Sequence, residues 1–269
     1  MGIGAEVSPL VRTETDGAVT VLSLDRADRH NALVPELLAD LRAGLDGVDD
    51  ATRAVLLRAE GRSFSTGGDL AAFARHTDRP DAIAAYAHGL LGELNAAVLA
   101  LLDLPVPLVV ALGGPVTGGS IGLVAPADVV VAADHAWIQP YYAQVGFSPD
   151  GGWTALLPHL IGRGRVADTL VRDRRISARE AADWGLVSEV VADDAVDVAA
   201  RVAADRIAGL RPGALSSTRQ LLAHDRAAVA GALEAERASF CAQIRTPEAR
   251  EGIHAFLAEL ATTPTTGGR

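Results

Sequence analysis

Apolar residues follow two different patterns in the first half of this chain: a helical spacing and continuous runs. Where they recur every three or four positions, the pattern predicts helices over 35–48 and 81–102. Runs rich in apolar and β-branched residues predict four strands: Val19–Leu24, Ala54–Ala59, Leu108–Leu112 and Val129–Ala132. Strands separated by helices indicate an α/β fold.

Helical spacing dominates the second half of the chain. Ser177 and Glu180 have the spacing of a capping box ahead of a short helix, and Leu186–Val191 is predicted to form a strand. Thr246, followed by a proline, is the predicted cap of the last helix. Four longer helices are predicted over 194–210, 215–224, 228–244 and 247–260.

The change of pattern near Arg175 divides the chain into two parts. Residues 1–175 are the predicted core domain, and residues 176–261 are the predicted helical region. Residues 262–269 are rich in Thr and Gly and are predicted to be a disordered tail.

Composition and charge exclude several classes of protein. Apolar residues make up 49% of the 269 residues, enough for a large core, and the net charge of −10 argues against a nucleic-acid-binding surface. The single cysteine, Cys241, excludes an intrachain disulfide framework and fits a reducing compartment. Since we see neither a leader pattern nor an unbroken apolar run of membrane length, we expect a cytoplasmic protein without a membrane partner.

Two glycine clusters each stand between a predicted strand and a segment that can start a helix. The first contains Gly67 and Gly68, and the second contains Gly118 and Gly119. A helix start leaves backbone N–H groups without internal partners, and glycine allows close approach to them because it has no Cβ. Two such turns converging on one carbonyl oxygen would form an oxyanion hole, although either cluster alone could be a simple tight turn.

Four segments, in this order, resemble the crotonase (enoyl-CoA hydratase/isomerase) superfamily: Asp25–Leu33, Phe64–Leu70, Gly114–Gly119 with Asp128 after it, and Ser177–Val190. The resemblance covers about residues 8–260. It implies an α/β fold built as a spiral of β-β-α units followed by a C-terminal helical region. It also implies a homotrimer or hexamer, with trimer contacts in that helical region.

The resemblance further implies the substrate and part of the site. Family members act on acyl thioesters of coenzyme A, and we expect no separate cofactor and no metal. The thioester carbonyl lies between two backbone N–H groups, which by position belong to Gly68 and Gly119. In the first loop, Thr66, Asp69 and Leu70 are expected near the substrate, with Asp69 also capping the helix that follows.

Both catalytic glutamates of the classical hydratases are replaced in this chain. Gly122 stands at one of these positions and Tyr142 at the other. Hydration needs a base for water and an acid for the α-carbon. Glycine supplies neither, and a tyrosine of ordinary pKa is a poor base. The two-glutamate mechanism is therefore disfavoured, and Tyr142 is expected to line the acyl pocket or to pack.

One acid remains in a matching position. The segment Gly146–Trp153 resembles the Ser-Pro-Asp-Gly-Gly stretch of isomerase-like members, which makes Asp150 the candidate base. Burial beside an acyl chain would raise its pKa toward neutrality. Pro-Asp-Gly is also good turn chemistry, so Asp150 could instead cap a helix that begins near Trp153.

The predicted function is an isomerase or isomerase-like lyase that stabilises a thioester enolate and uses one Asp base. A hydratase with a rearranged acid pair, a hydrolase or dehalogenase with Asp150 as nucleophile, and an acyl-CoA-binding protein without catalysis remain alternatives. Arg26 and Arg29 could meet the coenzyme A phosphates, since a forked guanidinium suits phosphate, or could be solvated surface charges.

Overall fold

The computed structural model describes residues 8–223 and 225–262. Within these residues the main sheet has six strands. The edge strand pairs antiparallel with its neighbour, and the other neighbours pair in parallel. In spatial order the strands are β1 (Val11–Asp16), β2 (Val19–Leu24), β3 (Ala54–Ala59), β4 (Leu108–Leu112), β6 (Val129–Ala133) and β9 (Glu189–Val191).

A smaller sheet joins the second glycine cluster to the start of the helical region. Its central strand pairs in parallel with one neighbour and antiparallel with the other. In spatial order its strands are β5 (Val116–Thr117), β7 (Trp137–Gln139) and β8 (Ile176–Ser177).

Helices make up most of the remaining structure. The α-helices of the described residues are α1 (Pro35–Asp46), α2 (Leu70–Ala74), α3 (Pro80–Leu102), α4 (Tyr142–Val145), α5 (Leu157–Ile161), α6 (Arg163–Val171), α7 (Ala178–Asp183), α8 (Val196–Ala208), α9 (Pro212–Leu222), α10 (Arg226–Gln243) and α11 (Pro247–Thr262). Short 3-10 helices are η1 (Ala27–Arg29), η2 (Gly118–Leu123) and η3 (Asp193–Ala195).

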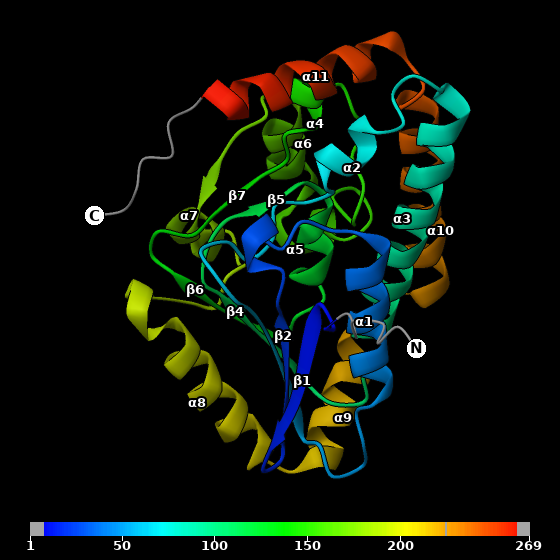
Figure 1. Cartoon of the computed structure of the whole chain (residues 1–269). Helices are drawn as coiled ribbons and strands as arrows, with labels where there is room; N and C mark the ends of the chain where they lie inside the picture. The colour runs from blue at the N-terminus through cyan, green and yellow to red at the C-terminus, as the bar shows by residue number, and fades with distance from the viewer. Residues whose placement is uncertain (1–7, 224, 263–269) are drawn as a thin grey trace, which may run out of the picture.

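The main sheet lies between helices (Figure 1). In this view α8 packs from one side on β2, β3, β4 and β6, and α1 packs on β1 and β2 from the other. α3 packs against both α1 and α10, and α11 crosses the end of the molecule over α2 and α4. The strand β2 is buried along its whole length, as expected for a strand covered on both faces.

α3 is 23 residues long and apolar enough to cross a membrane by length and composition alone. Its buried side chains, such as Leu90, Leu94 and Val98, belong to the hydrophobic core. The helix also packs against α1, α10 and η2. Packing inside the protein therefore accounts for the apolar character of α3.

The fold confirms most predicted elements. β2, β3 and β4 have the predicted bounds. The capping box of Ser177 and Glu180 is formed, and the Thr246 hydroxyl accepts a hydrogen bond from the Ala249 N–H at 3.2 Å. The predicted division near Arg175 falls between α6 and β8, but β8 and β9 extend both sheets, so residues after 175 also contribute strands to the core.

Some elements differ from the sequence prediction. β1 was missed because, apart from Val11, its side chains are exposed and form no apolar run. The helix expected near Trp153 begins only at Leu157, since residues 151–156 form turns. Residue 224, the predicted end of one helix, and 263–269, nearly all of the predicted tail, lie outside the described residues.

Candidate active site

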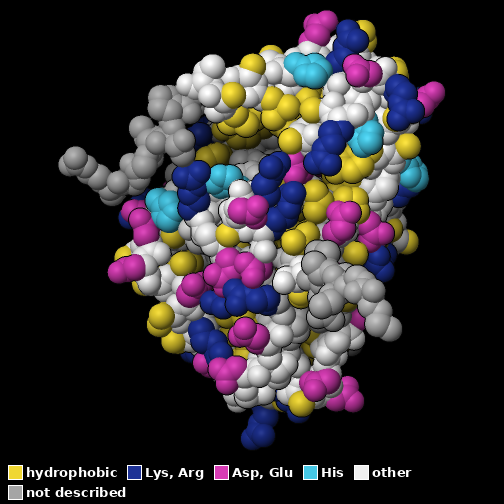
Figure 2. Space-filling model, viewed as in Figure 1, with side chains coloured by type: hydrophobic (Ala, Val, Ile, Leu, Met, Phe, Trp, Pro, Cys, Tyr) yellow, Lys and Arg dark blue, Asp and Glu magenta, His cyan; other side chains and the backbone are white. Residues whose placement is uncertain are grey.

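A cavity of about 720 Å³ opens among the two glycine loops, α3, α10 and α11. Figure 2 shows a hollow lined by hydrophobic side chains, with basic and histidine side chains along its rim. Its wall contains seven of the eight site residues that the sequence predicted: Thr66, Gly68, Asp69, Leu70, Gly119, Tyr142 and Asp150.

The first glycine loop places Gly68 on the wall of this cavity. The Leu33 N–H donates to the Gly67 carbonyl oxygen at 2.7 Å, which fixes the peptide joining Gly67 to Gly68. A trans peptide points its C=O and N–H in opposite directions, so the Gly68 N–H faces away from the Leu33 backbone. Within the described part of the chain, no acceptor is found for this N–H.

Trp153 fixes the second loop in the same way. Its fully buried indole donates from Nε1 to the Gly118 carbonyl oxygen at 2.9 Å, so the Gly119 N–H on the same peptide faces away from the indole. Gly119 is also in the first turn of η2, where N–H groups lack partners inside the helix. Gly68 and Gly119 thus line one cavity, and among the described residues neither backbone N–H has an acceptor.

Each loop uses its two glycines for different physical reasons. Gly67 and Gly118 have φ values of 72° and 53°, in the left-handed region that glycine adopts without strain. Gly68 and Gly119 have no room for a Cβ, which would lie 2.9 Å from the Phe73 ring and 2.5 Å from Asp150 Oδ1, respectively. The first glycine of each pair sets the direction of the peptide that joins it to the second. The second glycine lets neighbouring side chains approach that peptide closely.

Together with Asp69, Asp150 is a buried acid on the wall of this cavity. It is 7% exposed, and the Tyr142 hydroxyl donates to its Oδ1 at 2.5 Å. Burial raises the pKa of Asp150 to about 7; the Tyr142 hydrogen bond opposes this rise, and the charge of Glu236 adds to it. No donor among the described residues reaches Oδ2. A carboxyl group of this pKa can both take and return a proton near neutral pH.

Asp150 is not a helix cap. Its carboxylate contacts Tyr142, while α5 begins seven residues later, at Leu157. Tyr142 itself is buried, and burial followed by the nearby Asp150 charge raises the pKa of its phenol. The tyrosine therefore stays protonated and acts as a hydrogen-bond donor to Asp150.

Glu236 on α10, which is not among the predicted site residues, holds the turn that follows Asp150. Its carboxylate accepts from the N–H groups of Gly152, Thr154 and Ala155 at 2.8, 2.7 and 3.0 Å, and from the Thr154 hydroxyl at 2.7 Å. Burial raises the pKa of Glu236, although these hydrogen bonds oppose the rise.

The sequence contained one signal for Glu236. The buried positions of α10 are Val229, Leu233, Glu236 and Phe240, so a glutamate occupies an apolar stripe. A carboxylate buried at such a position needs hydrogen-bond donors, which marks it as a structural or catalytic group.

The backbone of Gly151 fills the space that a hydratase glutamate would need at position 122. A Cβ on Gly122 would lie 2.6 Å from the Gly151 carbonyl oxygen and 2.8 Å from the Val98 side chain. Gly151, at φ 64°, packs closely against Gly119. The turn that carries Asp150 therefore excludes the missing acid sterically.

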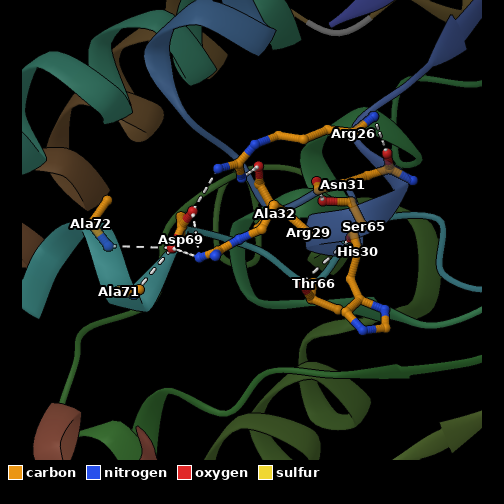
Figure 3. A network of polar contacts seen from close by, with 10 residues as sticks. All are labelled: Arg26, Arg29, His30, Asn31, Ala32, Ser65, Thr66, Asp69, Ala71 and Ala72. Carbon is orange, nitrogen blue, oxygen red and sulfur yellow. Dashed lines mark hydrogen bonds and ion pairs between the residues drawn. The ribbon is translucent and has the colours of Figure 1, made fainter.

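Arg26 is not part of the cavity wall, and the structure gives it a bracing role in place of the predicted phosphate contact. Its guanidinium donates to the Ala32 carbonyl oxygen at 2.9 Å and pairs with Asp69 at 2.8 Å (Figure 3). Asp69 also accepts from the N–H groups of Ala71 and Ala72, and so caps α2 as predicted. Together these contacts brace the first glycine loop.

The ion pairs also set the charge of Asp69. Burial would raise the pKa of this carboxyl, but the hydrogen bond from Arg26 and the charges of Arg26 and Arg29 hold it below its ordinary value. Asp69 is therefore ionised and committed to internal partners, which leaves Asp150 as the buried carboxyl of the wall that can exchange a proton near neutral pH.

Two further arginines stand on the cavity wall. The side chain of Arg29 is 46% exposed and reaches Asp69 at 3.3 Å. Arg62 contacts Nε2 of His30 at 3.1 Å. Burial, followed by the charge of Arg62, lowers the pKa of His30, which favours its neutral form. Within residues 8–223 and 225–262 no cluster of three or more His, Cys, Asp or Glu residues suited to a metal ion is found.

The family model for enoyl-CoA hydratase/isomerase matches residues 14–263. The chain belongs to this family. It is 29% identical over 252 residues to the 1,2-epoxyphenylacetyl-CoA isomerase of Escherichia coli (strain K12), covering 93% of this chain and 95% of that protein. It is 30% identical over 183 residues to 4-chlorobenzoyl coenzyme A dehalogenase-2 of Arthrobacter sp, covering 66% of this chain and 64% of that protein.

Solved structures confirm the crotonase fold. A crystal structure of an enoyl-CoA hydratase/isomerase from Mycobacterium paratuberculosis matches with a TM-score of 0.83 at 26% identity, covering 93% of this chain and 99% of that one. The protein is thus a crotonase-family acyl-CoA enzyme, as its motifs predicted.

In this crotonase enzyme, two substitutions are expected to move the Asp150 pKa in opposite directions. Tyr142→Phe removes a hydrogen bond that favours the carboxylate, so the pKa should rise from about 7. Glu236→Gln removes a neighbouring negative charge, so it should fall. Carbon-13 NMR titration of the Asp150 carboxyl, assigned with Asp150→Asn, measures both shifts, which should be about one pH unit. Shifts in the same direction would contradict this electrostatic account.

Gly122→Glu is expected to destabilise the protein by about 3 kcal/mol or more, because it overpacks the Gly151 turn and buries an unpaired charge. The matched control is Gly164→Glu in α6, where an added Cβ meets no atom within 4 Å. This variant should stay within about 0.5 kcal/mol of the parent protein. Chemical denaturation measures both, and equal stability of the two variants would show that position 122 has room for the acid.

Proposed function

We propose that this enzyme isomerises the double bond of an enoyl-CoA thioester, or carries out a related lyase reaction, with Asp150 as its one acid–base group. The observation that carries the proposal is the position of this carboxyl. It is buried in the cavity, directly against Gly119, on the wall that also carries the free amide of Gly68.

In the proposed reaction the thioester carbonyl oxygen accepts hydrogen bonds from the N–H groups of Gly68 and Gly119. Asp150 Oδ2 takes a proton from the α-carbon, and the C–H electron pair moves toward the carbonyl to form an enolate. Asp150 then returns the proton to the γ-carbon, and the double bond moves into conjugation. In other enzymes one oxyanion donor contributes about 3–4 kcal/mol to this kind of stabilisation.

The distribution of acids favours isomerisation over hydration. A hydratase needs a second acid–base group beside the acyl chain. The other carboxylates on the described cavity wall are Asp28, which is exposed, and Asp69, which is paired with arginines. Glu236 is not on the wall and is engaged with backbone donors. Proton transfer by Asp150 alone is consistent with this arrangement.

Arg29 and Arg62 are the proposed contacts for the coenzyme A phosphates. Both line the cavity, and their guanidinium groups suit phosphate oxygens. They replace Arg26 in this role, since its guanidinium is already occupied by Ala32 and Asp69. The acyl group would then extend from the glycine loops into the apolar part of the cavity.

Asp150→Asn is expected to lower kcat for enoyl-CoA isomerisation by about 10² to 10⁴-fold, because the amide cannot accept a proton. The dissociation constant for a saturated acyl-CoA should change little, since Asn keeps the shape and can still accept from Tyr142. The melting temperature at pH 8 should rise, because the variant no longer buries an ionised carboxylate whose pKa in the fold is about 7.

The matched control for this experiment is Asp50→Asn, which makes the same change at an exposed position outside the cavity wall. It should leave both kcat and the melting temperature unchanged. Unchanged turnover by Asp150→Asn would rule out the one-acid mechanism. Absence of turnover by the wild type with binding retained would favour an acyl-CoA-binding protein.

We infer that the enzyme assembles as a homotrimer or hexamer through its C-terminal region. Of the large exposed hydrophobic side chains, most lie after residue 175: Val198, Val202, Leu210, Leu221, Leu222 and Leu260. Leu221 and Leu222 are 87% and 75% exposed on adjacent positions at the end of α9. Burial between subunits would remove this apolar surface from water.

Sedimentation at micromolar concentration is expected to show the wild type as a trimer or hexamer. Leu221→Glu combined with Leu222→Glu should dissociate it into subunits, because charges would be placed in the contact. The control is Val171→Glu in α6, which is 81% exposed and lies outside the C-terminal region. A monomeric wild type would contradict the inferred assembly.

A further inference from the structure

Aromatic side chains are concentrated around the cavity. The chain has five Phe, three Trp and three Tyr residues, and seven of these eleven line the cavity. A straight acyl chain needs no aromatic wall, because leucine and valine bury methylene groups equally well. The concentration of aromatic rings around the cavity therefore bears on the kind of acyl group that the site accepts.

Three of these residues form a phenylalanine cluster, Phe73, Phe147 and Phe240. The ring centroids of Phe147 and Phe240 are 4.9 Å apart in an edge-to-face arrangement, and Phe73 lies 5.8 and 6.1 Å from them. The cluster joins α2, the segment after α4, and α10. Its residues come from three separate elements, so the rings meet only in the folded enzyme.

The phenylalanine cluster lies next to the proposed reacting atoms. A Cβ on Gly68 would lie 2.9 Å from Cε2 of Phe73, which places this ring directly beside the first amide donor. Leu94 from α3 lies beside the second, since a Cβ on Gly119 would be 3.0 Å from its Cδ2. An acyl group whose carbonyl contacts both amides would extend its first carbons between Asp150 and this cluster.

We propose that the acyl group carries a six-membered ring, aromatic or cyclic and unsaturated, and that the phenylalanine cluster recognises this ring. The inference rests on the proposed isomerase function and names its substrate class. Aromatic rings attract other rings in edge-to-face or offset geometry at centroid separations of 4.5–7 Å, a range that the cluster already shows internally. A rigid ring also loses less conformational entropy on binding than a flexible chain.

The proposed reaction is balanced on a ring substrate without any further reagent. With a cyclohexenylacetyl thioester, Asp150 would remove a proton from the α-carbon and return it to the ring γ-carbon. The double bond would move from the ring into conjugation with the thioester. One C–H bond breaks and one forms, and Asp150 ends in its starting state.

Two thioesters with eight acyl carbons test the proposal on the full chain. (Cyclohex-1-enyl)acetyl-CoA and 3-octenoyl-CoA undergo the same shift of a β,γ double bond, and the conjugated products are followed by absorbance. The ring substrate is expected to have a kcat/KM about tenfold or more above that of the chain. Phe147→Leu should reduce this ratio about tenfold, while melting temperature confirms that the variant is folded.

The matched control is Trp184→Leu, since Trp184 is an aromatic residue outside the cavity, stacked on Arg165 and Arg174. It should leave the ratio unchanged. Turnover of both substrates with an equal or higher kcat/KM for the straight chain would overturn the ring inference and leave the isomerase function intact.

Binding of saturated analogues separates the two proposals if neither thioester is turned over. Calorimetry then compares cyclohexylacetyl-CoA with octanoyl-CoA. Tighter binding of the ring, lost in Phe147→Leu, supports ring recognition even though the isomerase function has failed. Equal dissociation constants overturn the ring inference as well.

Discussion

The Glu236 carboxylate accepts four hydrogen bonds from the turn of residues 152–154 and from Ala155. Asp150 lies just before this turn, and the turn contains Trp153, whose indole fixes the peptide of Gly119. One buried group on a C-terminal helix therefore secures both the acid and one amide donor. Each buried donor left unsatisfied would cost about 1–3 kcal/mol, so the site geometry depends strongly on this contact.

The sequence predicted those features that depend on local pattern. The strands β2, β3 and β4 are rich in apolar and β-branched residues, and the glycine loops carry residues that a strand-to-helix turn needs. Motif order then identified the family and led to Asp150 as the candidate base. The signal for each strand, loop or motif lies within a few neighbouring residues, where side-chain size, φ and solvent contact decide the chain geometry.

Contacts between distant segments were not predictable in this way. Arg26 resembles a surface phosphate ligand in sequence, but its partner Asp69 is 43 residues away. Glu236 is 84 residues from the Gly152 amide that it accepts. The edge strand β1 lacks an apolar run because, apart from Val11, its side chains face solvent. These contacts and exposures depend on which distant segments of the chain meet in the folded protein. A single sequence does not contain a direct signal for such meetings.

Glu236 and Phe240 are four residues apart, on one face of α10. One supports the turn beside Asp150, and the other belongs to the phenylalanine cluster. A shift or rotation of this helix would therefore move part of the phenylalanine cluster and the support of the turn beside Asp150 together. Directed evolution toward other acyl groups should for this reason draw on Phe73 and Phe147, which lie on other segments, so that these rings can change while the turn beside Asp150 is left intact.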